Sequence, residues 1–123
     1  MNIFLVFLGG GLGSVARYFT AVFSKKIISS DFPFGTFLSN ITSSFILGLL
    51  VGWLAFRAVN QEPWRLFIAV GFCGGFSTFS SFSLETFDML RTGNYFVAGV
   101  NIFLSVIVSI AALWAGAQVI KMF

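Results

Sequence analysis

The chain has 123 residues, of which 58% are hydrophobic and only 9% are charged, and its mean hydropathy is +0.98. A soluble domain carries about 25% charged residues, so this composition excludes an ordinary soluble domain. A helix needs about 20 apolar residues to cross a bilayer, and four crossings with short loops use the whole chain. We therefore expect an all-α membrane protein with a single transmembrane domain over residues 1–123.

The reactive side chains exclude several classes of function. The single cysteine, Cys73, cannot form an internal disulfide. The absence of histidine argues against a zinc or redox-metal site and leaves no plausible nucleophile–base pair for an enzyme. The net charge of +3 comes from scattered residues, whereas a nucleic-acid site needs a clustered basic patch. We expect neither an enzyme nor a nucleic-acid partner.

The first predicted membrane helix covers about residues 2–23 and carries glycines between Gly9 and Gly13. It lacks the basic start and the small-residue cleavage site of a signal peptide, so we interpret it as a retained helix. A polar connection over residues 24–33 follows. The second predicted helix covers about residues 35–56.

The third predicted helix covers about residues 64–90, and the fourth covers about residues 95–120. Two glycines, Gly74 and Gly75, precede five hydroxyl residues within seven positions of the third helix. Glycine costs a helix about 1 kcal/mol relative to alanine, and Ser and Thr compete for backbone carbonyls. We therefore predict a break near residues 74–78, in the middle of the membrane.

Irregular backbone at membrane depth is tolerated only where protein buries it or a cavity wets it. Its free carbonyls suit a hard cation such as Na⁺, and its free amides suit an anion. Packing of small residues against another helix is the alternative interpretation. It explains the glycines but not the number of hydroxyls.

Phe76, Phe79 and Phe82 recur at every third position of the same segment and therefore share one helix face. Aromatic rings carry positive edges, so rings presented edge-on could coordinate an anion that has lost its water. The alternative is a phenylalanine stripe that faces lipid or packs in the core. The hydroxyls between the rings favour the anion interpretation.

The second and fourth helices also carry polar residues. Asn40 lies inside the second helix, and its amide needs a partner at that depth. Asn101, Ser105 and Ser109 are spaced four apart and should face one way along the fourth helix. Interhelical hydrogen bonding is the alternative role for Asn40, but one such bond does not need the whole line on the fourth helix.

Three of the charged residues near helix ends are candidates for a functional role. Arg17 either extends its charge to the interface or attracts anions at a pore mouth. Glu85 and Asp88 are one turn apart at the end of the third helix, where they could line an aqueous vestibule. Neither has a neighbouring His or Lys, so paired acid–base catalysis is poorly supported.

The positive charges are nearly equal on the two sides of the predicted membrane domain. One side holds Arg57, Arg65 and Lys121, and the other holds Lys25, Lys26 and Arg91, with Arg17 near the end of the first helix. Orientation follows an excess of Lys and Arg on one side, and no clear excess exists here. We expect insertion in both orientations, as an antiparallel homodimer requires; a weakly biased single topology is the alternative.

These features together resemble the Fluc (CrcB) fluoride channel family over essentially the whole chain. The matching segments are Gly9-Gly10-Gly11-Leu12-Gly13 followed by Arg17; Gly35-Thr36 followed by Asn40; Gly71-Phe72-Cys73-Gly74-Gly75-Phe76-Ser77-Thr78-Phe79-Ser80-Ser81-Phe82-Ser83 with Glu85; and Gly93-Asn94-Tyr95. The segment in the third helix is highly specific, and the others are weaker alone.

The resemblance implies passive F⁻ export that relieves fluoride toxicity, through a dual-topology homodimer with two pores and one structural Na⁺, in a bacterial cell (inner) membrane. It assigns the Na⁺ to the backbone carbonyls of Gly74 and Ser77. It assigns the pore to Asn40, Phe79, Phe82, Ser80, Ser81, Ser105 and Ser109, and the vestibule to Arg17 and Glu85. The expected partners are a second copy of the chain, fluoride and the lipid bilayer.

The chain departs from the family pattern beside Asn40. Ser43 stands where the family usually has glycine, and Ser39 stands where an aliphatic residue is common. Ser77 replaces the more frequent threonine, which a backbone carbonyl ligand would survive.

Two other functions compete with a fluoride channel. A small multidrug transporter is also short and four-helical, but it needs an acidic residue in the first helix, where this chain has none. A purely structural subunit predicts no ion flux and has no use for the polar line on the fourth helix.

Overall fold

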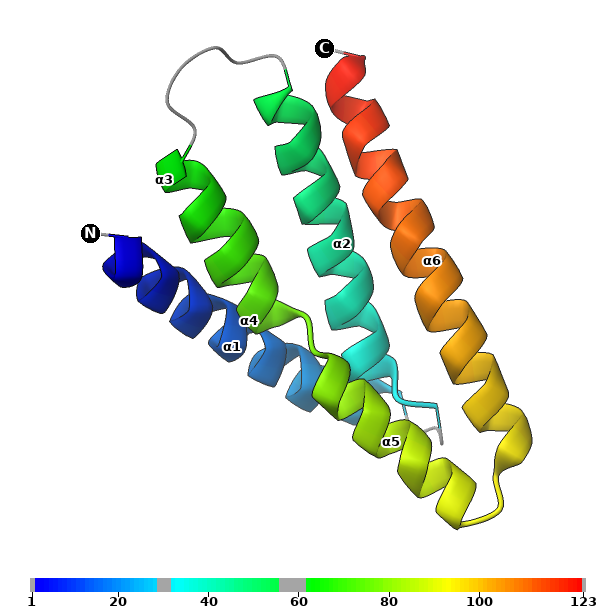
Figure 1. Ribbon diagram of the computed structural model, residues 1–123. Coiled ribbons are helices and arrows are strands. Elements are labelled where there is room, and N and C mark those ends of the chain that lie inside the picture. The colour runs from blue at the N-terminus through cyan, green and yellow to red at the C-terminus, as the bar shows by residue number, and fades with distance from the viewer. Residues whose placement is uncertain (1, 29–31, 56–61, 123) are drawn as a thin grey trace.

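The computed structural model describes residues 2–28, 32–55 and 62–122. In chain order they form α1 (Asn2–Ile27), α2 (Phe34–Leu54), α3 (Glu62–Trp64), η1 (Arg65–Cys73), α4 (Gly74–Phe76), α5 (Phe79–Arg91) and α6 (Tyr95–Lys121) (Figure 1). This part of the chain contains no β-strand. The predicted all-helical class is therefore confirmed.

Four helical spans are long and apolar enough to cross a membrane: Asn2–Ile27, Phe34–Leu54, Glu62–Arg91 and Tyr95–Lys121. They confirm the four predicted membrane helices. The first span runs four residues beyond the predicted end, because Lys25 and Lys26 occupy its last turn, where cations interact favourably with the helix dipole. Arg57, which entered the charge comparison, lies outside the described residues.

The third span is built from several helical pieces. Its first part, η1, has π-helical hydrogen bonding, which the sequence did not predict. The backbone is extended at Ser77 (φ −81°, ψ 156°) and Thr78 (φ −153°, ψ 121°), between α4 and α5. Gly74 and Gly75 belong to α4, so the irregular backbone is shorter than the predicted 74–78.

Two helix pairs make the closest contacts. The most extensive contact joins α2 to α6, and the next joins α1 to η1; Figure 1 shows α2 and α6 side by side. Both depend on glycine: a Cβ at Gly48 would collide with the Leu113 carbonyl oxygen of α6, and a Cβ at Gly13 with the Phe72 carbonyl oxygen of η1. In contrast, α5 touches α6 and α2 only sparsely.

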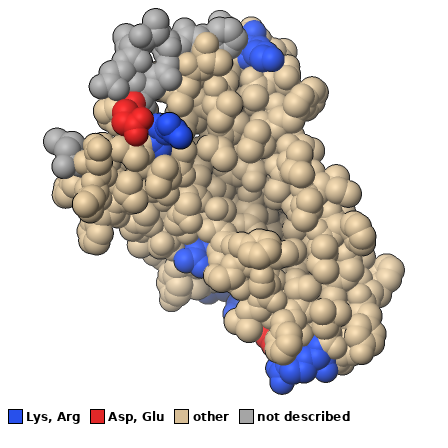
Figure 2. Space-filling view, in the orientation of Figure 1, with Lys and Arg blue, Asp and Glu red and all other residues tan. Residues whose placement is uncertain are grey.

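The outer surface is largely apolar. Figure 2 shows a broad uncharged surface, with most of the Lys, Arg, Asp and Glu side chains toward its upper and lower ends. Large hydrophobic side chains such as Ile3 (86% exposed) and Phe96 (82% exposed) point outward. Such a surface suits lipid rather than water, and the chain is a multi-pass membrane protein.

Candidate functional site

Asn40 of α2 holds the extended segment between α4 and α5. Its Oδ1 accepts a hydrogen bond from the Thr78 backbone N–H at 2.8 Å, and its Nδ2 donates to the Thr78 carbonyl at 3.3 Å. Thr78 also caps α5, since its Oγ1 accepts from the Ser81 N–H at 3.1 Å. One amide therefore binds both backbone groups of the residue that caps α5.

The side chains of Asn40 and Thr78 take two N–H groups that a continuous helix would direct to its own backbone carbonyls. In a continuous helix the Thr78 N–H would donate to Gly74, and the Ser81 N–H would donate to Ser77. Here those donors bind Asn40 Oδ1 and Thr78 Oγ1 instead. Gly74 is also exposed at the outer surface of the chain. The side chains of Asn40 and Thr78 thus remove the usual helical donor from the carbonyls of Gly74 and Ser77.

Backbone carbonyl oxygens are the ligands that a cation would use at this position. No group of three or more His, Cys, Asp or Glu side chains is placed to hold a metal within residues 2–28, 32–55 and 62–122. Hard cations bind oxygen, including backbone carbonyl oxygen. The residues at the interruption therefore fit such an ion without any charged ligand.

Ser43, which stands where the family usually has glycine, makes a hydrogen bond that glycine could not make. It is 2% exposed, and its hydroxyl donates to the Cys73 carbonyl at 3.0 Å. That carbonyl also accepts from the N–H and the hydroxyl of Ser77, at 2.9 and 2.6 Å. The extra hydroxyl therefore joins α2 to the end of η1. The other departure, Ser39, is fully buried, and its hydroxyl has no hydrogen-bond partner among the residues that the structure describes.

Arg17 of α1 binds backbone rather than a cavity. Its Nε donates to the Gly75 carbonyl at 3.1 Å, and the side chain is half-buried. It lines neither of the two cavities described below. The structure thus places Arg17 beside the interruption in the third span.

An outward-facing groove of about 300 Å³ collects most of the predicted pore residues. We call it the α5–α6 groove; its lining residues are Asn40, Ser44, Ser77, Thr78, Phe79, Phe82, Ser105, Val106, Ser109 and Ile110. The rings of Phe79 and Phe82 lie 5.7 Å apart with planes inclined by 41°. Phe79 is 78% exposed, so the groove opens on the outer surface of the chain.

Ser80 and Ser81 lie outside the α5–α6 groove. The Ser80 hydroxyl is exposed and lies 3.2 Å from Thr78 Oγ1. Ser81 lines a second, larger cavity. The structure therefore brings together Asn40, Phe79, Phe82, Ser105 and Ser109, but not these two hydroxyls.

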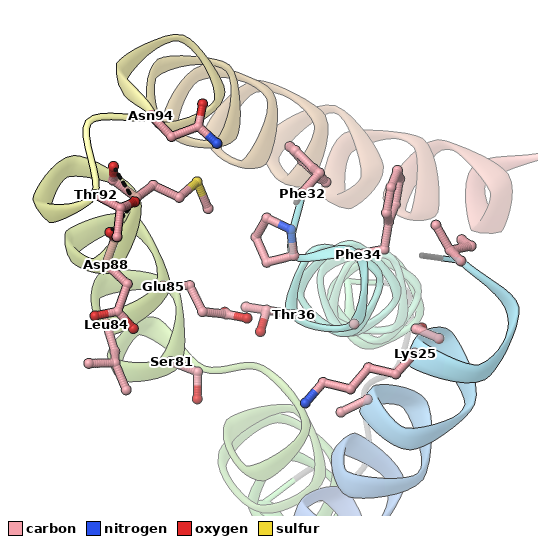
Figure 3. A pocket seen from close by; sticks show the side chains of 16 residues that line it. Lys25, Phe32, Phe34, Thr36, Ser81, Leu84, Glu85, Asp88, Thr92 and Asn94 are labelled. Carbon is pink, nitrogen blue, oxygen red and sulfur yellow. Dashed lines mark hydrogen bonds between the residues drawn. The ribbon is translucent and has the colours of Figure 1, made fainter. Parts of the chain in front are cut away.

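The second cavity, of about 810 Å³, contains most of the nearby charge. Lys25 extends into it from α1, and Glu85 reaches across it toward Thr36 (Figure 3). One carboxylate oxygen of Glu85, Oε1, is buried and has no hydrogen-bond partner within residues 2–28, 32–55 and 62–122. Asp88 pairs with Arg91 at 3.2 Å on the outside. The cavity thus brings the opposite charges of Lys25 and Glu85 to one space, where they attract each other.

The polar line on α6 divides between two environments. Ser109 lines the α5–α6 groove, whereas Asn101 is 1% exposed and Ser105 is 7% exposed. Ser105 Oγ donates to Asn101 Oδ1 at 3.1 Å, and Asn101 Nδ2 donates to Thr86 Oγ1 at 3.0 Å. The hydroxyl proton of Ser105, which lines the groove, is therefore already used inside the chain.

The sequence did not single out Thr78 and Thr86 as functional residues. Thr78 had a local signal, since a threonine directly before a helix is a common N-cap. Thr86 lies seven residues after Phe79 and shares its face of α5. Its importance depends on contact with α6, which no local pattern reveals.

Comparison with known proteins identifies similar chains along nearly the full length. The family described as CrcB-like protein, Camphor Resistance (CrcB), matches residues 4–117. A fluoride-specific ion channel FluC of Coxiella burnetii (strain CbuK_Q154) is 44% identical over 117 residues, or 94% of each chain. FluC 2 of Nitrobacter hamburgensis is 40% identical over 98% of each chain. FluC of Pyrococcus abyssi is 46% identical over 91% of this chain and 89% of its own length.

Proposed function

The chain belongs to the CrcB-like protein family, an ion-channel family rather than a family of enzymes, and we propose that it is a fluoride-specific channel. Relatives that match it over nearly their full length carry the name fluoride-specific ion channel. In the cell, such a channel would let F⁻ leave passively and so relieve fluoride toxicity. The cell membrane of a bacterium is the location that we propose.

The observation that carries this proposal is the neutral, donor-bearing lining of the α5–α6 groove. Fluoride is small and strongly hydrated, so a pore must replace its water with donors while still letting the ion leave. An amide NH₂ has two protons, and Asn40 uses one on Thr78. The second proton, the Ser109 hydroxyl and the edges of the phenylalanine rings supply partial positive charge. Ser80, Ser81 and Ser105 would then support this pathway from its margins.

We propose that the groove becomes a closed pore when a second, antiparallel copy covers it. The open side of the groove and the exposed ring of Phe79 support this arrangement. Two copies related in this way would form two pores and bring the interruptions at Ser77 and Thr78 together near the membrane centre. The balanced positive charge in the sequence is consistent with insertion in both orientations.

A structural Na⁺ fits between the two proposed copies. The carbonyls of Gly74 and Ser77 from each subunit would hold it, because the usual donors to both carbonyls bind elsewhere. When bound, the cation would take these carbonyl oxygens as ligands, in place of the helical N–H donors that they lack. This chain's own contribution is to hold the backbone on either side of those carbonyls, at Cys73 through Ser43 and at Thr78 through Asn40.

The cavity around Glu85 and Lys25 serves as the proposed aqueous vestibule of the pore. Its opposite charges can hold mobile ions near the groove without binding them tightly. Arg17, assigned to the vestibule by resemblance, would act from the side by adding positive potential near the interruption. Its bond to Gly75 supports this placement.

The proposal is tested by efflux from liposomes that contain the purified protein. F⁻ and Cl⁻ loss are recorded with ion-selective electrodes after the membrane potential is clamped with a K⁺ ionophore. We expect rapid F⁻ efflux and Cl⁻ efflux indistinguishable from protein-free liposomes. Equal and negligible flux of both anions would overturn the assignment.

A further inference from the structure

A buried chain of hydrogen bonds connects the two walls of the α5–α6 groove from behind. It runs in one direction: Ser105 Oγ donates to Asn101 Oδ1, Asn101 Nδ2 donates to Thr86 Oγ1, and Thr86 Oγ1 donates to the Phe82 carbonyl. The distances are 3.1, 3.0 and 2.8 Å in that order. Both ends of the chain, Ser105 and Phe82, line the groove.

The two middle members are well shielded from the surface. Asn101 is 1% exposed and Thr86 is 8% exposed, and neither lines the groove itself. A buried amide or hydroxyl without a partner is costly. The three hydrogen bonds run in one direction from Ser105 to Phe82, so the four groups hold one another in place.

Helix α5 depends on this series of hydrogen bonds for its placement. Its only buried residues are Thr86 and Met89, and its contacts with α6 and α2 are sparse. Residues seven and four positions apart lie on one helix face, so Thr86 shares a face with Phe79 and Phe82. Tying Thr86 to Asn101 therefore fixes the rotation of α5 and the direction of both rings.

We propose that Thr86 and Asn101 are positioning residues that set the spacing of the two groove walls, and so align Phe79 and Phe82 for fluoride. The inference rests on the proposed fluoride pathway, and it assigns a role to two residues that do not touch the ion. An ordinary interhelical bond would stabilise the fold without affecting the ring orientation.

The test compares three variants, each of which changes one side chain of the wild-type protein. Thr86→Val removes the hydroxyl and keeps the shape, and Thr86→Ser keeps the hydroxyl. Thr20→Val is the matched control, because Thr20 also donates to its own helix, at 2.9 Å to the Ala16 carbonyl, and lines neither the groove nor the vestibule. Each variant is examined by F⁻ efflux and by ¹⁹F NMR of 4-fluorophenylalanine placed at position 82.

We expect Thr86→Val to slow F⁻ efflux by about tenfold or more, because small misplacements are costly where geometry matters, and to shift or broaden the ring signal. Thr86→Ser should stay within about twofold of wild type with an unshifted signal, and Thr20→Val should change neither. Wild-type efflux in Thr86→Val, or reduced efflux with an unmoved ring signal, would overturn the positioning role.

A double variant distinguishes the loss of the positioning role from misfolding. Asn101→Leu alone removes the partner of both the Thr86 and the Ser105 hydroxyls. Thr86→Val combined with Asn101→Leu removes both sides of the Asn101–Thr86 bond, which can be nearly neutral for stability, and leaves only the Ser105 hydroxyl, which lines the groove, without its acceptor. We expect the double variant to fold and to lose no more flux than Thr86→Val alone; additive losses would contradict a single unit. If wild type itself carries no F⁻, the proposed function fails, and the ring signal then decides the positioning claim alone.

Discussion

The α2–α6 pair and helix α5 are held in the membrane domain in different ways. The α2–α6 pair is joined by close backbone contact, in which Gly48 and Gly116 bring the helices together. Helix α5 is joined by side-chain hydrogen bonds from Asn40 through Thr78 and from Asn101 to Thr86. Backbone contact between small residues suits a rigid scaffold, and polar bonds suit a part whose orientation matters. Changes in the first region should therefore affect folding, and changes in the second should affect conduction.

The largest expected effect is on the scaffold. Gly48→Leu places side-chain atoms against the Leu113 carbonyl of α6, and we expect it to cost roughly 3 kcal/mol or more and to prevent folding. Monodisperse protein after detergent extraction is the measurement. Gly11→Leu is the control, because a Cβ there meets nothing within 4 Å. Equal yields from the two variants would show that the contact is not needed.

The next effect is on the interruption of the third span. Asn40→Leu removes the hydrogen bonds to both backbone groups of Thr78, and we expect F⁻ efflux to fall by about 100-fold, as for loss of a preorganised donor. Thr42→Val, on an exposed face of the same helix, should conduct like wild type. Retained flux in Asn40→Leu would mean that neither the amide nor the extended segment is needed.

A smaller loss is expected at the rings. Phe79→Ile and Phe82→Ile keep apolar bulk but remove the positive ring edge, which is worth about 1 kcal/mol and so about fivefold to tenfold in F⁻ efflux. Phe96→Ile, on the outer surface of α6, serves as the control. Unchanged flux in both groove variants would rule out coordination by ring edges.

The smallest effect distinguishes two roles of Arg17. Arg17→Lys keeps the charge but loses the planar guanidinium that donates Nε to Gly75. If the bond matters, we expect F⁻ efflux to fall by about threefold, the size of one modest hydrogen bond. Efflux equal to wild type in Arg17→Lys, with a loss in Arg17→Gln, would show that only the charge is needed.

The sequence predicted those parts of the structure that follow from local patterns. Apolar runs located the four spans, and the Gly74–Gly75 pair with its hydroxyls predicted irregular backbone at a point where Ser77 and Thr78 are extended. It did not predict the π-helical η1. It also did not predict the partner of Arg17, because that bond depends on how α1 packs against the third span. The Thr86–Asn101 bond was inaccessible for the same reason, since its members are 15 residues apart on different helices.

The most direct test of the pathway is chemical block of the α5–α6 groove. Ser109→Cys places a thiol in the groove. The natural Cys73 is buried, and its thiol donates a hydrogen bond to the Ser43 carbonyl. A small cationic thiosulfonate reagent is added to liposomes holding the variant or the wild type, and F⁻ efflux is recorded. We predict that modification of Ser109→Cys stops efflux while wild type is unaffected. Full modification with undiminished efflux would contradict a fluoride pathway along this groove.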